Sequence, residues 1–193
     1  MKKEKEIETF CPASQKDWRQ WLSENHGAKQ SVWLVYHKIK SGVPSISWSH
    51  AVDEALCFGW IDSTARPIDE HTFMQFFCKR KPKSMWSKIN KAKIERLIDE
   101  GLMTKAGFDS IEMAKQNGSW QILDDVEELK IPRDLIAAFK TQRGSKAFFM
   151  SLSKSVRKSM LQWLVLAKKP ETRQKRIEEI VVLAGQKQKP KQF

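Results

Sequence analysis

The chain has 193 residues, of which 40% are hydrophobic and eight are tryptophan, and its formal net charge is +12. This apolar content is enough to bury a core, so the composition argues against a wholly disordered chain and favours one domain that folds alone. Cys11, Cys57 and Cys78 lack CxxC or finger spacing, which argues against a disulfide framework and a structural zinc site.

The positive charge is concentrated in two segments. Residues 79–96 contain eight Lys or Arg and one acid, and residues 168–193 contain eight and three. Such a distribution favours an anionic partner, which could be a phosphate-bearing or other anionic small molecule, nucleic acid or an acidic surface. The alternative is that exposed lysines on helices only keep the protein soluble.

The N-terminal sequence MKKEKEIETF has no apolar run of the kind that a signal peptide needs, and no later run approaches the ~18 apolar residues of a membrane span. We therefore expect a cytoplasmic protein without a membrane span. Residues 1–10 are expected to be a disordered lead-in and residues 186–193 a basic tail. Between them we expect a single domain, 11–185, with an α/β part at 11–83 and a helical part at 84–185.

The first predicted elements are a helix and a strand. Ser14 can cap a helix to Leu22 that has Trp18 and Trp21 on its apolar face. Residues 31–40, SVWLVYHKIK, are rich in β-branched and aromatic residues, and their nearly continuous apolar run predicts a central strand covered on both faces.

The clearest helical periodicity follows Ser47, a candidate cap. One apolar stripe contains Trp48, Ala51, Val52, Ala55, Leu56 and Gly59. His50, Asp53 and Cys57 are predicted on the opposite side, where three mixed ligands without a fourth are only a weak metal signal. We therefore expect a polar helix face and no metal site.

From Gly59 the pattern changes to period two and predicts a hairpin of two strands, at about Trp60–Ala65 and Thr72–Lys79. After Lys83 the pattern is helical. Ser84 and Asn90 are both candidate caps of the first helix.

Further helices are expected after Thr104, with Phe108 facing inward, near Pro132 and after Pro170. Strands grouped early and helices grouped late predict an α+β fold, with a small, mainly antiparallel sheet packed by helices and an all-helical C-terminal half.

Two motifs together resemble a known bacterial family. The first is ALCFGWIDS at 55–63 followed by FFCKRKPKSMWSKIN at 76–90, and the second is AKKPETRQKRIEEIV at 167–181. Their combination is similar to the YdeI/OmpD-associated family, and the likeness extends roughly over residues 18–184.

This chain departs from the family pattern at two places. Members usually have Thr-Pro-Arg where it has Cys78, Lys79 and Arg80, and His50 replaces a frequent acid. The resemblance implies a link to envelope stress and to protection against cationic antimicrobial peptides or bacteriocins. It implies no catalytic mechanism and no cofactor.

A non-enzymatic anion-binding module is the function that this pattern favours. Arg80 is the preferred anchor because its planar fork can grip a carboxylate or phosphate, and a helix start at Ser84 would add free backbone N–H groups. The candidate ligand-binding residues are Trp60, Asp62, Arg80, Lys81, Lys83, Ser84 and Trp86.

Two alternatives stay open. The basic segments could bind nucleic acid with Trp86 stacking on a base, although no RNP, KH or helix-turn-helix signature is present. A small enzyme could use Asp62, with His37 or His71 as a partner. A purely structural interpretation is that Asp62 accepts backbone hydrogen bonds in a turn and that Trp60 and Trp86 pack in or beside the core.

Overall fold

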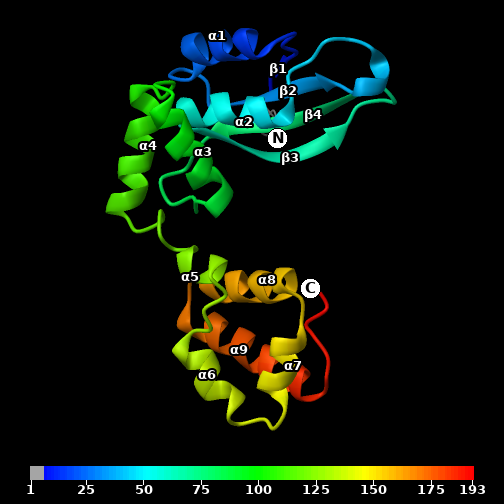
Figure 1. The fold of residues 1–193 in the computed structure, drawn as a ribbon, viewed down its shortest axis with the longest axis vertical. Helices are drawn as coiled ribbons and strands as arrows, with labels where there is room; N and C mark the ends of the chain where they lie inside the picture. Colours follow the sequence, from blue (N-terminus) through cyan, green and yellow to red (C-terminus); the bar gives the residue numbers. More distant parts are fainter. Residues whose placement is uncertain (1–6) are drawn as a thin grey trace, which may run out of the picture. The chain divides into compact units, whose positions relative to one another are not determined.

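The computed structural model describes residues 7–193, and the chain divides into two compact units with the boundary between Trp120 and Gln121 (Figure 1). The first unit contains a sheet and four long helices, and the second is helical. The predicted α+β fold is confirmed. Residues 1–6, which belong to the predicted lead-in, lie outside the described residues.

The sheet of the first unit has the strand order β1-β2-β4-β3. Its strands are β1 (Thr9–Phe10), β2 (Ser31–His37), β3 (Trp60–Pro67) and β4 (Thr72–Lys79). The pairs β2–β4 and β3–β4 are antiparallel, and only the short β1 pairs in parallel with β2. The sheet is therefore mainly antiparallel, as predicted. The strand predicted at residues 31–40 stops at His37 because the short 3₁₀ helix η1 (Ile39–Ser41) follows it.

The helices of the first unit are α1 (Gln15–Asn25), α2 (Trp48–Cys57), α3 (Lys88–Asp99) and α4 (Lys105–Gln116). Ser14, Ser47 and Thr104 cap α1, α2 and α4, as predicted. The cap of α3 is Ser87, whose Oγ accepts the backbone N–H of Asn90, so both predicted caps of this helix were wrong.

Helix α2 is covered on nearly all sides, and the predicted polar face was wrong. Every residue from Ala51 to Cys57 is buried, including Asp53 and Glu54. The Glu54 carboxylate accepts from Arg19 of α1 at 2.6 Å, and Asp53 accepts from Lys93 and Arg96 of α3 at 2.5 Å each. These ion pairs allow two carboxylates to be buried between helices.

One face of the sheet packs against α1 and α2. Along β2, Val32, Leu34 and Tyr36 are buried, whereas the alternate residues are only half-buried. The strand is therefore covered fully on one face, and the expectation of burial on both faces was wrong. Trp60 of β3 and Leu56 of α2 also belong to this core.

The second unit contains α5 (Asp124–Glu127), α6 (Arg133–Phe139), α7 (Ser145–Ser151), α8 (Lys154–Val165) and α9 (Pro170–Gly185). Its core is built mainly from α6 to α9, with Leu135, Phe149, Leu164 and Ile180 fully buried or nearly so. The ring of Phe193 lies 5.7 Å from that of Trp163, so the end of the basic tail packs on α8. None of the helices within residues 7–193 has the length and hydrophobicity that a membrane crossing requires.

Candidate ligand-binding site

Arg80, the predicted anchor, is packed against the protein. Its Cζ lies 3.6 Å from the centroid of the Trp86 ring, and its Nη1 donates to the backbone oxygen of Met85 at 2.8 Å. Burial lowers the pKa of the guanidinium to about 10, although Asp62 and Cys78 act in the opposite direction. Arg80 therefore remains charged at neutral pH and holds the segment that follows β4.

In the rest of the basic segment, defined as residues 79–88, the exposed lysines and Trp86 have different surroundings. Lys81 and Lys83 are exposed, and the backbone N–H of Ser84 donates to the Lys81 carbonyl in a turn rather than starting a helix. Trp86 is 1% exposed, and its ring centroid lies 5.0 Å from that of Trp120. A buried Trp86 cannot stack on a nucleic-acid base. Only the positive charge of the basic segments therefore still favours nucleic-acid binding.

Trp60 and Asp62 lie on the same face of β3 but have different surroundings. Trp60 is fully buried and packs edge-on against Trp21 at 5.8 Å between ring centroids. Asp62 is half-buried, and its Oδ2 accepts from Trp48 Nε1 at 2.9 Å and from Gln75 Nε2 at 2.8 Å. Asp62 therefore fixes the orientation of two side chains at the inner face of the sheet.

The predicted partners of an Asp62-based enzyme are not in contact with it. His37 Nε2 lies 3.6 Å from the Sγ of Cys11, and the backbone N–H of His71 donates to Asp69. Burial, followed by the nearby Glu54 carboxylate, raises the pKa of Cys57 to about 11, so this thiol is neutral at physiological pH. Over residues 7–193, no three His, Cys, Asp or Glu side chains are grouped so that they could hold a metal ion.

A cavity of about 550 Å³ opens where β2 ends and α2 begins, and we call it the β2–α2 cavity. Two local hydrogen bonds hold the connecting loop: Ser45 Oγ accepts the His37 backbone N–H at 3.1 Å, and the Gly42 N–H donates to the Ile39 carbonyl at 3.2 Å. Gly42 turns the chain with a φ of 69°. The wall includes Tyr36 and Phe73, whose rings stack at 4.8 Å with an angle of 6° between their planes.

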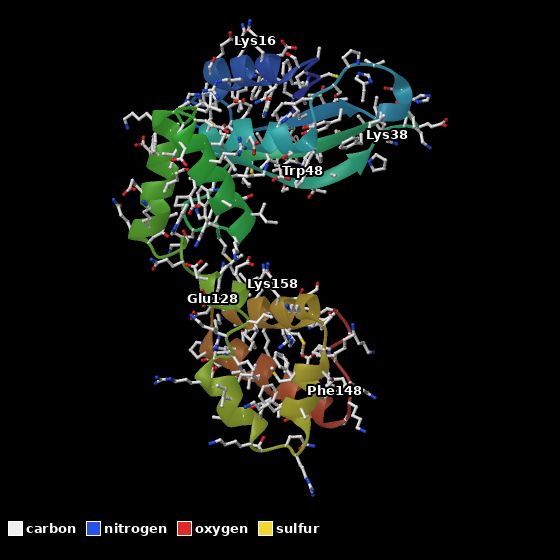
Figure 2. The ribbon with its side chains drawn as sticks, in the orientation of Figure 1. Lys16, Lys38, Trp48, Glu128, Phe148 and Lys158 are labelled. Carbon is white, nitrogen blue, oxygen red and sulfur yellow. The ribbon has the colours of Figure 1, made fainter. Side chains whose placement is uncertain are left out.

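Exposed apolar side chains surround the cavity. Ile39, Val43 and Trp48 all line it, and each is about half exposed or more. Figure 2 shows Trp48 at the start of α2, on the side towards β3. Contiguous exposed apolar groups often mark a binding surface, because they gain most when a ligand covers them.

Two of the residues that line the cavity, Lys38 and Lys40, carry positive charge, and among the described residues no Asp or Glu lines it. The Asp62 carboxylate lies nearby, where it accepts from the indole of Trp48. Lys38 Nζ donates to the backbone oxygens of Asp69 and Glu70, whereas Lys40 is exposed (Figure 2 labels Lys38). Because Ser47 and Trp48 also line the cavity, the positive end of the α2 dipole lies there as well.

This cavity was not predicted from the sequence, because an anion site was expected where Lys and Arg residues are closely spaced. Lys38 and Lys40 stand alone in a segment that was predicted as strand. A usable signal was present, since an apolar residue, Val43, sits between Gly42 and Pro44 in turn material that is otherwise polar.

Two family profiles match the chain. Residues 10–110 match Domain of unknown function (DUF8412), and residues 128–187 match the family described as Bacteriocin-protection, YdeI or OmpD-Associated. The predicted resemblance is thus confirmed over residues 128–187, which include the motif at 167–181. The motif at 55–63 and 76–90 falls within the first profile, so the likeness does not extend over residues 18–184 as expected.

No curated protein and no solved structure matches the chain. The two profiles fall on different units of the fold, one within residues 7–120 and the other within residues 121–193. The first profile covers more than half of the chain, so the chain belongs to the DUF8412 family. The second unit of the chain is YdeI/OmpD-associated-like.

Proposed function

We propose that the first unit is a binding module for a small organic anion, which it holds in the β2–α2 cavity. The observation that carries this proposal is the combination of exposed apolar side chains and basic groups around one cavity of about 550 Å³. Ligand sites are commonly ~300–1,000 Å³ and mostly apolar, with a few polar groups that fix orientation.

The arrangement favours a ligand with an apolar body and one acidic group. Ile39, Val43 and Trp48 would cover the apolar body, and Lys40 would provide a point charge at the rim. Lys38 is tied to the turn at Asp69 and Glu70, so it adds positive potential from a more fixed position. A highly charged polymer would gain little from the apolar wall.

The second unit adds a physiological context to the proposal. The profile that matches residues 128–187 is described by bacteriocin protection, and on that ground we propose that the protein acts in envelope stress or antimicrobial-peptide protection. Survival of a deletion strain challenged with a cationic peptide measures this role. Full survival without the gene would contradict it.

A charge reversal at the rim tests the binding site. We expect Lys40→Glu to weaken binding of benzoate or hexanoate by about fivefold to tenfold, because one attractive exposed pair is replaced by a repulsive one. Lys81→Glu is the matched control, since it makes the same change at an exposed lysine of the basic segment. It should change the affinity less than about twofold. Ligand-observed NMR and calorimetry at low ionic strength measure both variants.

The control also tests the site predicted from the sequence. If Lys81→Glu weakens binding and Lys40→Glu does not, the anion binds at residues 79–88 and the cavity is not the site. If the wild-type protein binds neither acid at millimolar concentration, the proposal of an organic-anion module is wrong.

A further inference from the structure

The wall of the β2–α2 cavity contains a buried hydroxyl group that has no partner. Tyr36 is 1% exposed, and its Oη has no hydrogen-bond partner among the described residues. Tyr36 is also one of the residues that line the cavity. Its ring is held in place, because Tyr36 is buried on β2 and its ring stacks on that of Phe73.

An unpaired buried hydroxyl is unfavourable and therefore informative. Leaving such a group unsatisfied costs about 1–3 kcal/mol, and nearly all buried polar groups in folded proteins have a partner. Phenylalanine at this position would fill the same space without that cost. The hydroxyl therefore indicates a partner that comes from outside the chain.

The surroundings of Tyr36 describe that partner further. Burial, followed by the nearby Asp62 carboxylate, raises the pKa of Tyr36, so the phenol remains neutral and able to donate a hydrogen bond. Phe73 and the exposed indole of Trp48 supply flat aromatic surface on the same cavity. Trp48 donates its indole N–H to Asp62 and is half exposed, so its ring is available to a ligand in the same cavity.

We infer that the ligand is a flat hydroxy acid, whose carboxylate lies at the lysine rim and whose hydroxyl hydrogen-bonds to Tyr36 Oη. This inference rests on the proposed function, because it specifies the ligand of the same cavity. It assigns two different tasks to two residues. Lys40 recognises the charge of the acid, and Tyr36 recognises its hydroxyl group.

Matched pairs of acids and variants separate the two tasks. Benzoate is compared with 3-hydroxybenzoate and 4-hydroxybenzoate, which differ from it only by the hydroxyl group. The wild-type protein should bind at least one hydroxybenzoate about fivefold to tenfold more tightly than benzoate, the effect expected of one net hydrogen bond. Tyr36→Phe should remove this preference, so that the variant binds benzoate and the hydroxybenzoates with equal affinity. Lys40→Glu should weaken binding of all the acids by the same factor and keep the preference.

The melting temperature of the free protein gives an independent readout. Tyr36→Phe should melt at the same temperature as the wild-type protein or higher, because it removes a hydroxyl that has no partner. A lower melting temperature means that the hydroxyl is satisfied within the protein, and it overturns the inference.

The binding outcomes distinguish the inference from the function on which it rests. If benzoate and the hydroxybenzoates bind equally, or if Tyr36→Phe keeps the preference, the inference is wrong and the anion-binding function stands. If none of the acids binds to the wild-type protein, both are wrong.

Discussion

Replacing Leu56 with alanine is expected to lower the free energy of unfolding of the first unit by about 2–5 kcal/mol. Leu56 is 0% exposed and lies on α2, the helix that packs against α1, α3, α4 and β3. Its truncation removes apolar contacts and leaves a cavity that close-packed neighbours can fill only in part.

Chemical denaturation followed by tryptophan fluorescence measures this effect. Seven of the eight tryptophans lie within residues 1–120, so the signal reports mainly on the first unit. Ile89→Ala is the control, because Ile89 belongs to α3 and is 69% exposed. It should cost less than about 0.5 kcal/mol. A loss of that small size for Leu56→Ala would contradict the packing of α2 described here.

Features that depend on neighbouring residues could be predicted from the sequence. Ser14, Ser47 and Thr104 cap helices because a side-chain oxygen reaches a backbone N–H three residues later, which is a local geometry. The end of α2 was predictable for the same reason, since Gly59 adopts a φ of 71° that other residues rarely take. The stripe containing Leu56 was predictable from its periodicity.

The errors occurred where distant segments decide the environment. Asp53 looked like a solvent-facing residue, but its partners Lys93 and Arg96 are about 40 positions away, and no local pattern reveals them. Phe108 is 43% exposed although it was expected to face inward, because periodicity alone does not say which side of a helix is covered. Burial of a charge depends on partners that only the folded chain supplies.

The candidate site shows the same division. The sequence placed Trp60 and Asp62 in one predicted strand, and both lie on the inner face of β3. It could not show that Asp62 orients Trp48, because this contact joins a helix to a strand across a turn. Val43 was a local signal for an apolar loop, but the β2–α2 cavity itself could not be predicted, since Tyr36, Lys40 and Trp48 meet only through tertiary packing.

Replacing Arg80 with alanine is expected to destabilise the first unit by about 2 kcal/mol. The variant loses the guanidinium that lies 3.6 Å from the Trp86 ring centroid and its hydrogen bond to Met85. Each of these interactions is worth about 1–2 kcal/mol in a desolvated setting, and relief of the buried charge offsets part of the loss. Because Trp86 is buried beside Trp120, the gap would also loosen their packing.

Lys83→Ala is the matched control for Arg80→Ala, because Lys83 is an exposed cation three residues away in the same segment. It should change the free energy of unfolding by less than about 0.5 kcal/mol. Arg80→Met keeps the unbranched apolar stem over Trp86 and removes the charge, so it should lose about half as much stability as Arg80→Ala. Urea denaturation of the three variants decides between the two roles of Arg80. If Arg80→Ala is as stable as Lys83→Ala, Arg80 does not stabilise the fold. Arg80 would then be available to bind an anion, as predicted from the sequence for residues 79–88.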